Sequence, residues 1–362
     1  MKKTCFRLLI ALVTISLLLA LTACGKEPES PAPSIAEDPT TTTTVATTTA
    51  PTEVVDELGV NPLTGIKDMT TDNNRPIGYV VPDESSKLVQ VGIDQADMYF
   101  QAETEGGIPR MLCIFSSVDR IPDAIGPIRS ARPHFVKMAA ALDLIYCHIG
   151  GSPSGVDTIQ QLGVDDIEDA SVKDSTLEAA VSSGNNVSWN NKSFTKSKVL
   201  DSINRQKFST TTSTKSPFSF GDKKGDDTAN TVDIKISASF QMAFTYDADR
   251  GVYQKHRNSV NTGIHKAASG GAVEVSNVIV MYDTRYVDTV EPKEGTTRYN
   301  FELKSGSGHL ASGGTVREIK WTRTNGQLSY FEADGTTPLT VSEGKTYIAL
   351  VSKEYKSGTK FY

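Results

Sequence analysis

The sequence predicts a two-domain α+β protein: an N-terminal α/β domain with a mixed sheet and strand–helix–strand units, and a C-terminal domain of mostly antiparallel β-structure. Between residues 97 and 163, short apolar runs alternate with helical patterns, which is typical of strand–helix–strand units. From residue 231 onward, apolar residues alternate with a period of two, and turn signals separate the runs. We therefore expect domains at residues 59–205 and 231–362, with a linker or long loop at 206–230.

The N-terminus has the features of a bacterial lipoprotein leader. A short basic segment ends at Arg7, and residues 8–23 are almost wholly apolar. Such a run suits a signal peptide better than a spanning helix, which needs about 20 residues. Leu21-Thr22-Ala23-Cys24-Gly25 resembles a lipobox, at which signal peptidase cuts before a cysteine that is then acylated. We expect residues 1–23 to be removed and the lipid on Cys24 to hold the protein on the extracytoplasmic face of the cell membrane. An uncleaved membrane anchor with an incidental cysteine is the alternative.

Composition limits the class of partner. Residues 24–58 are rich in Thr, Pro and Ser and bury too little apolar surface to fold, so we expect a disordered tether. Cleavage removes three of the 37 basic residues and none of the 43 acidic ones, which changes the formal net charge from −6 to −9. An acidic protein of this kind is not expected to bind nucleic acid.

The predicted elements of the first domain follow from the spacing of the apolar residues and from the residues that begin and end helices. Ser130 is the expected N-cap of its first helix, and Gly163 the expected stop of its second. The elements are, in order, strands at 97–102 and 111–116, a helix at 131–142, a buried strand at 144–149 and a helix at 154–162.

The second domain begins with a clear alternating strand, in which Val232, Ile234 and Ile236 fall on one face. Glycine-containing turn signals then separate further apolar runs, which predicts antiparallel pairing through hairpins. The predicted strands lie at 278–282, 299–303, 316–321 and 347–351.

Nine short motifs occur in a specific order along the chain: Asn61–Gly65, Gln95–Asp97, Glu105–Arg110, Gly126–Arg132 and His148–Ser152, then Asn277–Val280, Gly306–Gly308, Asp334-Gly335 and Gly344–Tyr347. Together they resemble the YerB-like lipoprotein family, which carries a two-part domain of unknown function, number 3048. The resemblance covers nearly everything after residue 60 and implies a two-domain surface lipoprotein without an established activity. One departure concerns a His-Asn pair that is common in the family, where this chain has Trp189-Asn190-Asn191 before Phe194-Thr195. If that histidine has a chemical role in relatives, this chain lacks it.

A ligand site is expected where the predicted strands end. In a right-handed strand–helix–strand unit, the helix starts at the sheet edge where the parallel strands end. Free amides at helix starts, a Gly-Gly step and arginines suit a carboxylate or a phosphate. The expected ligand-binding residues are Arg110, Arg129, Ser130, Arg132, His148, Gly150, Gly151 and Ser152. The alternative is a scaffold, in which Arg129 and Arg132 pair with Glu103, Glu105 or Asp143 and His148 is a hydrogen-bonded core residue.

Catalysis is a weaker prediction, and the sequence leaves open whether the protein is an enzyme. Ser152 or Ser130 could act as a nucleophile with His148 as its base, but neither lies in a nucleophile-elbow motif. Glu103 and Glu105 could form a carboxylate pair, although alternate residues of a strand share a face by period alone. The catalytic candidates are therefore His148, Ser152 and Glu105.

Other groups of polar residues favour structural roles. The five histidines have no metal-ligand spacing, and we expect no metal and no cofactor. The acidic run at 165–169 reads as a surface turn. Residues 253–265 contain Tyr253, His256, Arg257 and His265, which could form an exposed glycan- or peptide-binding patch or reflect hairpin pairing.

Cys113 and Cys147 lie in apolar runs, where they could form a disulfide or act as buried apolar residues.

Together these features predict a membrane-anchored extracytoplasmic lipoprotein that binds an anionic cell-envelope ligand, such as a wall polymer or a lipid head group. The first alternative is a hydrolase or transferase that acts on a cell-wall polymer or precursor. The second is a non-catalytic assembly protein whose arginines are structural. The sequence identifies no protein partner.

Overall fold

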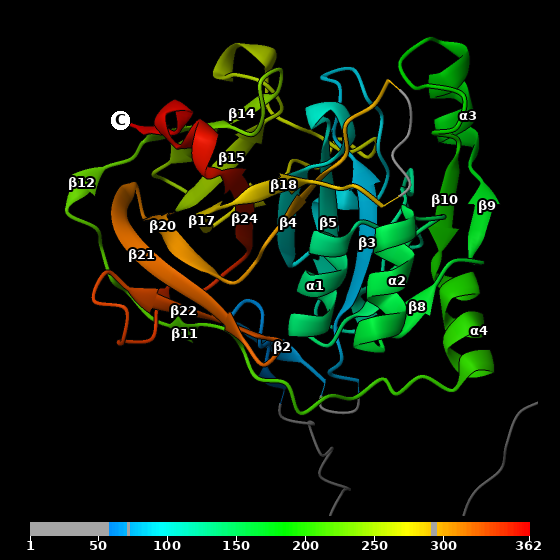
Figure 1. The fold of residues 1–362 in the computed structure, drawn as a ribbon, viewed down its shortest axis with the longest axis horizontal. Coiled ribbons are helices and arrows are strands. Elements are labelled where there is room, and N and C mark those ends of the chain that lie inside the picture. The colour runs from blue at the N-terminus through cyan, green and yellow to red at the C-terminus, as the bar shows by residue number, and fades with distance from the viewer. Residues whose placement is uncertain (1–57, 71–72, 291–294) are drawn as a thin grey trace, which may run out of the picture. The chain divides into compact units, whose positions relative to one another are not determined.

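A computed structural model describes residues 58–70, 73–290 and 295–362, and Figure 1 shows its fold. The signal peptide, Cys24 and all but the last residue of the predicted tether therefore lie outside the described residues. Among the residues that are described, no helix has both the length and the apolar character needed to cross a membrane.

The described residues of the first half begin with six strands and continue with four helices that are separated by strands. They are β1 (Gly59–Val60), β2 (Lys67–Met69), β3 (Ile77–Pro82), β4 (Met98–Glu103), β5 (Pro109–Phe115), β6 (Ala124–Ile125), α1 (Pro133–Ala141), β7 (Ile145–Cys147), α2 (Pro153–Leu162), β8 (Asp166–Ile167), β9 (Ser171–Lys173), α3 (Ser175–Ser182), β10 (Lys192–Thr195) and α4 (Lys196–Gln206).

In the second half, the described residues form strands and short 3₁₀ turns. The strands are β11 (Ser219–Phe220), β12 (Asp227–Thr228), β13 (Thr231–Lys235), β14 (Gln241–Asp247), β15 (Val252–His256), β16 (Glu274–Val275), β17 (Asn277–Asp283), β18 (Arg285–Val287), β19 (Tyr299–Phe301), β20 (Ser305–Ser312), β21 (Thr315–Thr324), β22 (Gln327–Glu332), β23 (Thr340–Val341), β24 (Thr346–Ser352) and β25 (Lys360–Phe361).

One mixed sheet of 11 strands contains strands from both halves of the chain. Its order is β12-β21-β20-β17-β24-β4-β5-β3-β7-β8, with β22 paired to β21. The halves meet where β24 pairs in parallel with β4, from Thr346 opposite Met98 to Leu350 opposite Ala102. Because β5 runs antiparallel between β4 and β3, six strands point the same way: β17, β24, β4, β3, β7 and β8. Their carboxyl ends therefore lie along one edge of the sheet.

The sheet is covered on both faces. On one face, α1 packs Phe135 against Phe100 in an edge-to-face contact with ring centroids 5.5 Å apart. On the other face lies a second sheet of five strands, in the order β16-β15-β14-β13-β25. Its Phe244 contacts Tyr347 of β24, with ring centroids 5.0 Å apart. Alternate residues of the central strands therefore enter two different apolar cores.

The predicted α+β class is confirmed, and most pairing in the second half is antiparallel. Strands at 98–103 and 109–115 and the helix at 153–162 agree with expectation, and Gly163 ends that helix with a φ of 62°. The predicted first helix begins later than expected. Its N-cap is Arg132 rather than Ser130, because Pro133 occupies the first helical turn.

Two further expectations need correction. In the large sheet, β5 precedes α1 and β7 follows it, and these two strands run in opposite directions, so the parallel strand–helix–strand unit is β7–α2–β8 instead. Cys113 and Cys147 are both buried free thiols, so the disulfide alternative is wrong. Burial raises the pKa of each thiol, and both therefore remain protonated at neutral pH. Short strands β11 and β12 lie inside the predicted linker, whose boundaries remain a prediction.

Candidate functional site

The edge at which the six parallel strands end brings the predicted site residues together. Residues 129–132, which lead into α1, are hydrogen-bonded to residues 149–152, which lead into α2. The amide of Ala131 donates to the carbonyl of Gly150 at 2.9 Å, and the amide of Ile149 donates to the carbonyl of Arg129 at 3.1 Å. Arg110 reaches the same edge because it lies at the start of the antiparallel strand β5.

Arg110 and Arg132 are both bound to one carboxylate, that of Glu105. Nη2 of Arg110 lies 2.7 Å from Oε1 of Glu105, and Nε of Arg132 lies 2.8 Å from Oε2. Burial alone would raise the pKa of Glu105, but the two arginines outweigh it and lower that pKa to about 2. Arg110 also donates to the carbonyl of Ser130 at 2.7 Å, and Arg132 to that of Ala131 at 2.6 Å. These two guanidinium groups therefore hold the loops of the edge in place.

His148 and Ser152 have structural partners. Nδ1 of His148 lies 2.8 Å from the carbonyl oxygen of Gly150, and its Nε2 lies 3.1 Å from Oδ2 of Asp166. Both ring nitrogens are thus occupied, and the residue is 2% exposed. Ser152 is the N-cap of α2, where its Oγ accepts from the amide of Gly155 at 3.1 Å. The structure therefore brings the two residues to one edge without the nucleophile–base hydrogen bond that catalysis would use.

Acidic side chains of the protein itself approach the start of α2. The amide of Gly150 donates to Oε1 of Glu168 at 2.6 Å, and the hydroxyl of Ser154 donates to Asp288. A helix start attracts anions, and here side chains of this chain already meet that preference. Gly151 is exposed and Ser130 half-buried, so both lie at the surface of the edge.

Arg129 differs from the other two arginines because 18% of its side chain is exposed. Its Nη2 lies 3.1 Å from Oε1 of Glu84, which also accepts from Asn190 at 3.2 Å. The guanidinium carbon lies 5.8 Å from the ring centroid of Trp189, whose indole is 63% exposed. Arg129 is therefore the arginine of the predicted set that is best placed to meet a ligand from solvent.

A buried polar cluster adjoins this edge, and it centres on Lys255 and Asp83. Nζ of Lys255 lies 2.8 Å from Oδ2 of Asp83, although the two side chains are 0% and 1% exposed. Lys255 also contacts Nδ1 of His265 at 3.1 Å, and Gln101 donates to Asp83 at 2.8 Å. Burial, with Lys255 and Arg257 nearby, holds the pKa of His265 well below its usual value, so its imidazole is neutral. The cluster therefore carries a buried ion pair.

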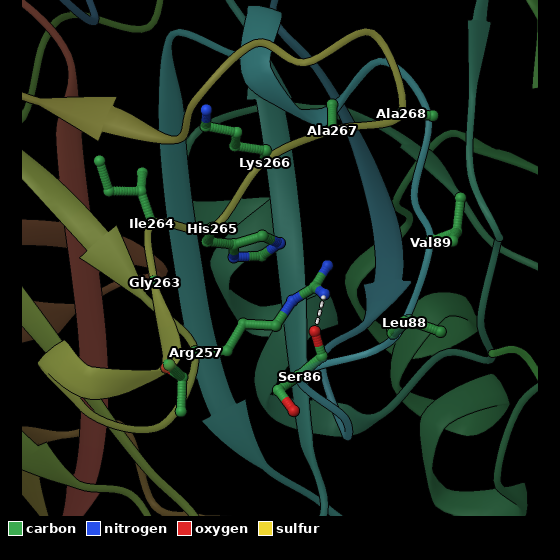
Figure 2. Close-up of a pocket in the computed structure, with 11 residues that line it drawn as sticks. Ser86, Leu88, Val89, Arg257, Gly263, Ile264, His265, Lys266, Ala267 and Ala268 are labelled. Atoms are coloured by element: carbon green, nitrogen blue, oxygen red, sulfur yellow. Dashed lines mark hydrogen bonds between the residues drawn. The ribbon is translucent and has the colours of Figure 1, made fainter.

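Arg257 connects this cluster with two surface hollows. Its Nε lies 3.3 Å from Oδ1 of Asp83, yet neither atom has a hydrogen-bond partner among the described residues. One hollow, of about 250 Å³, appears in Figure 2, where Arg257 donates to the carbonyl of Ser86 and lies beside His265. The second, of about 270 Å³, shares Ser86 and Arg257 with the first. Its wall also contains Glu84, Ser85, Ser239, Gln241 and Asn258.

A third hollow, of about 450 Å³, lies at the carboxyl end of β4 and is lined by Glu103, Glu105 and Arg285. Both carboxylate oxygens of Glu103 lie 2.9 Å from Nη1 of Arg285. Burial nevertheless raises the pKa of Glu103 to about 7. The guanidinium carbon of Arg285 lies over the rings of Tyr299 and Tyr355, at 4.2 and 4.9 Å from their centroids. The predicted carboxylate pair thus lines one hollow, with each member held by arginine.

Sequence reasoning missed the Lys255–Asp83 pair and took residues 253–265 as either an exposed patch or a hairpin. Tyr253, His256 and His265 are buried, so the exposed-patch interpretation is wrong and hairpin pairing of β14 with β15 is correct. A local signal existed, because Lys255 is two residues from the apolar Tyr253 and so lies on the inward face of the same strand.

Comparisons with known proteins identify relatives of the whole folded part. The model described as protein of unknown function DUF3048, N-terminal domain, matches residues 63–213, and its C-terminal counterpart matches residues 232–348. A Bacillus subtilis (strain 168) protein named "Putative lipoprotein YerB" is 26% identical over 300 residues, which cover 80% of this chain and 85% of that protein. The crystal structure of the YerB protein from Bacillus subtilis superposes with a TM-score of 0.69 at 22% identity, over 83% of this chain and 98% of that one. At that identity the structural likeness supports the fold alone.

Proposed function

This chain belongs to the family described as protein of unknown function DUF3048 and is related to a protein named a lipoprotein, and from that premise we propose that it binds an anionic cell-envelope ligand while anchored by a lipid on Cys24. The anchor would hold it on the extracytoplasmic face of the cell membrane. The binding surface would be the sheet edge around Arg129 together with the adjoining hollow at Arg257.

The observation that carries this proposal is an excess of cations over carboxylates within the network that joins Arg129 and Arg257. The adjoining start of α2 is excluded from this count, because Asp166, Glu168 and Asp288 contribute negative charge there. Five cations lie in one continuous network of ion pairs and neighbouring residues with three carboxylates: Arg110, Arg129, Arg132, Lys255 and Arg257 with Asp83, Glu84 and Glu105. The chain as a whole has a formal net charge of −6. A local field of opposite sign favours an anion here over the rest of the surface.

Within this edge, Arg129 and Arg257 would contact the ligand. Arg129 is the partly exposed arginine, and the guanidinium of Arg257 lines both hollows. Arg110 and Arg132 would position the loops through Glu105. His148 and Ser152 would do so through their own hydrogen bonds, and Ser130, Gly150 and Gly151 would form the surface beside Arg129.

The test is the melting temperature of the soluble part, residues 59–362, with and without anions. The probes are inorganic phosphate, a glycerol phosphate polymer and vesicles of phosphatidylglycerol, so that a wall polymer and a lipid head group give separate results. Arg129→Ala should lose the stabilisation seen in the wild type, because a charge-assisted contact is worth about 1.5–3 kcal/mol, or roughly ten- to a hundredfold in affinity. Arg250→Ala is the matched control, since its ion pair with Glu274 lies elsewhere on the surface. A wild-type protein that no anion stabilises, or an Arg129→Ala protein that responds fully, would overturn the proposal.

A second candidate function, hydrolysis or transfer on a cell-wall polymer, is favoured by Glu103 and Glu105. They line one hollow, and their environments move their pKa values apart, to about 7 and about 2, as an acid and a fixed anion would need. Turnover of labelled wall polymer that Glu103→Gln abolishes and Glu354→Gln retains would support it, because Glu354 is the exposed partner of the same Arg285. If the wild type shows neither turnover nor anion binding, the non-catalytic assembly role is favoured.

A further inference from the structure

We propose that the anionic ligand is a saccharide and that the exposed indole of Trp189 stacks against one of its rings. This inference rests on the proposed binding function and names its ligand class. Trp189 is 63% exposed, the largest exposed fraction among the bulky apolar side chains of the described residues. An exposed tryptophan offers a flat apolar face to a ligand, and the next residue, Asn190, is hydrogen-bonded to Glu84, which lines a polar hollow.

The loop that carries Trp189 is fastened on both sides of the indole. Before it, the side chain of Asn186 accepts from the amide of Val89 at 2.9 Å and donates to the carbonyl of Val89 at 3.1 Å. After it, Asn190 donates to Glu84 at 3.2 Å, and its amide closes a turn onto the carbonyl of Val187 at 2.8 Å. Asn186 and Asn190 are 7% and 0% exposed. The fold therefore holds the indole in solvent, and a ligand that stacks on it meets a surface that is already ordered.

The position of Trp189 links it to the proposed anion site. Glu84 accepts from Arg129 and Asn190 and also lines the hollow of about 270 Å³. That hollow presents hydroxyl and amide groups from Ser85, Ser86, Ser239, Gln241 and Asn258. Hydroxyls and side-chain amides both donate and accept hydrogen bonds, which is what the hydroxyl groups of a sugar require. A saccharide could thus place one ring on the indole and its polar groups toward the hollow.

An anion alone does not explain the indole, because the face of an aromatic ring carries partial negative charge and repels anions. A pyranose ring has an axial C–H face that is apolar and slightly positive, and it matches that surface. A membrane is the competing partner, since tryptophan is common at lipid–water interfaces. The saccharide is favoured because Asn190, the neighbour of the indole, is hydrogen-bonded to Glu84, and the hollow that Glu84 lines is rich in polar residues. Such groups hydrogen-bond the hydroxyls of a sugar and find no partner in the apolar interior of a bilayer.

The experiment uses the fact that the chain has two tryptophans, Trp189 and the fully buried Trp321. Acrylamide, an uncharged quencher, should therefore report mainly on Trp189. The acidic probe is N-acetylglucosaminyl-N-acetylmuramic acid, which bears a carboxylate, and chitotetraose is the neutral one. We expect the acidic disaccharide to shift the emission to the blue and to halve the acrylamide quenching, with weaker effects from chitotetraose.

The variants separate the two proposals. Trp189→Ala should bind the acidic disaccharide at least tenfold more weakly, measured by calorimetry, yet keep the phosphate-induced rise in melting temperature. Trp189→Phe should keep part of the affinity. Unchanged disaccharide affinity in Trp189→Ala, or emission that responds to phosphatidylglycerol vesicles and not to the saccharides, would overturn the saccharide assignment alone. A wild-type protein that is stabilised by none of the anions would instead overturn the anion-binding function on which the saccharide assignment rests.

Discussion

Nη2 of Arg110 lies 2.7 Å from Oε1 of Glu105, and the same carboxylate is bound by Arg132. The side chains of the two arginines are 10% and 7% exposed. Two buried cations therefore share one carboxylate as their counter-ion. Glu105 thus has a structural role that does not depend on any ligand. The relationship has a direct consequence for the stability of the protein in acid.

The first prediction concerns pH. The pKa of Glu105 is lowered from its usual 4.5 to about 2 in the folded protein, so the unfolded chain binds the proton more tightly. The stabilisation is therefore fully present above about pH 4.5 and is lost as the pH falls through about 2. Its size is about 3 kcal/mol. We expect urea unfolding to show this fall between pH 5 and pH 2.

Glu105→Gln provides the comparison. Removal of the charge leaves two buried guanidinium groups without their anion, which should cost about 3–5 kcal/mol at pH 7. The stabilities of wild type and variant should then converge as the pH approaches 2. If the difference in stability between wild type and Glu105→Gln stayed constant from pH 7 to pH 2, Glu105 would not titrate in this way.

The second prediction concerns the buried ion pair. Lys255→Met should lower the free energy of unfolding by up to about 3–5 kcal/mol, because the buried carboxylate of Asp83 loses its nearer cation and keeps only Arg257, whose Nε lies 3.3 Å from Oδ1. The double variant with Asp83→Asn should recover part of that loss. Lys266→Met is the control, since Lys266 is exposed in the same segment. If the stability lost by the double variant equals the sum of the losses from Lys255→Met and Asp83→Asn alone, the two side chains are not coupled.

Much of the fold could be predicted because its signals are local. Apolar runs and turn residues located β4, β5 and α2, and the order of elements predicted that Arg129 and His148 reach one sheet edge. The start of α1 was missed by two residues, although Pro133 gave a local signal for Arg132 as the cap.

The remainder depends on partners that lie far apart in the chain. Lys255 and Asp83 are separated by 172 residues. The period of the apolar residues shows which face of a strand a residue occupies, but not which other strand lies beside that strand. The scaffold alternative correctly named Glu105 as a partner of Arg132. Glu84, the partner of Arg129, could not be predicted for the same reason as the Lys255–Asp83 pair.

The third prediction concerns the anchor. Cys24→Ala should abolish labelling of the protein by an alkyne analogue of palmitate, because the lipobox cysteine is the expected acylation site. Cys5→Ser is the matched control, since Cys5 lies in the segment that signal peptidase should remove, and its labelling should equal that of wild type. Persistent label on the Cys24→Ala protein would refute the assignment.

The last prediction concerns the two halves, which we expect to fold only together. Without β24, the N-terminal half would expose the edge of β4 along the five residues that pair with Thr346–Leu350. The ring of Tyr99 would lose its stacked partner Tyr347, whose centroid lies 5.5 Å away. Without the five-stranded sheet, one apolar face of β3, β4 and β5 would also be uncovered. An unpaired edge and an exposed apolar face are both costly.

Residues 59–205 expressed alone should therefore lack a cooperative melt and should aggregate, and the same holds for residues 231–362. Intact protein cut by protease between 206 and 230 should elute as one particle in gel filtration and separate into two fragments in urea, because the shared sheet persists after the cut. Co-expressed halves should recover the melting transition. A sharp, reversible melt of the isolated N-terminal half would contradict this prediction, since it would mean that β4 does not need β24 for stable pairing.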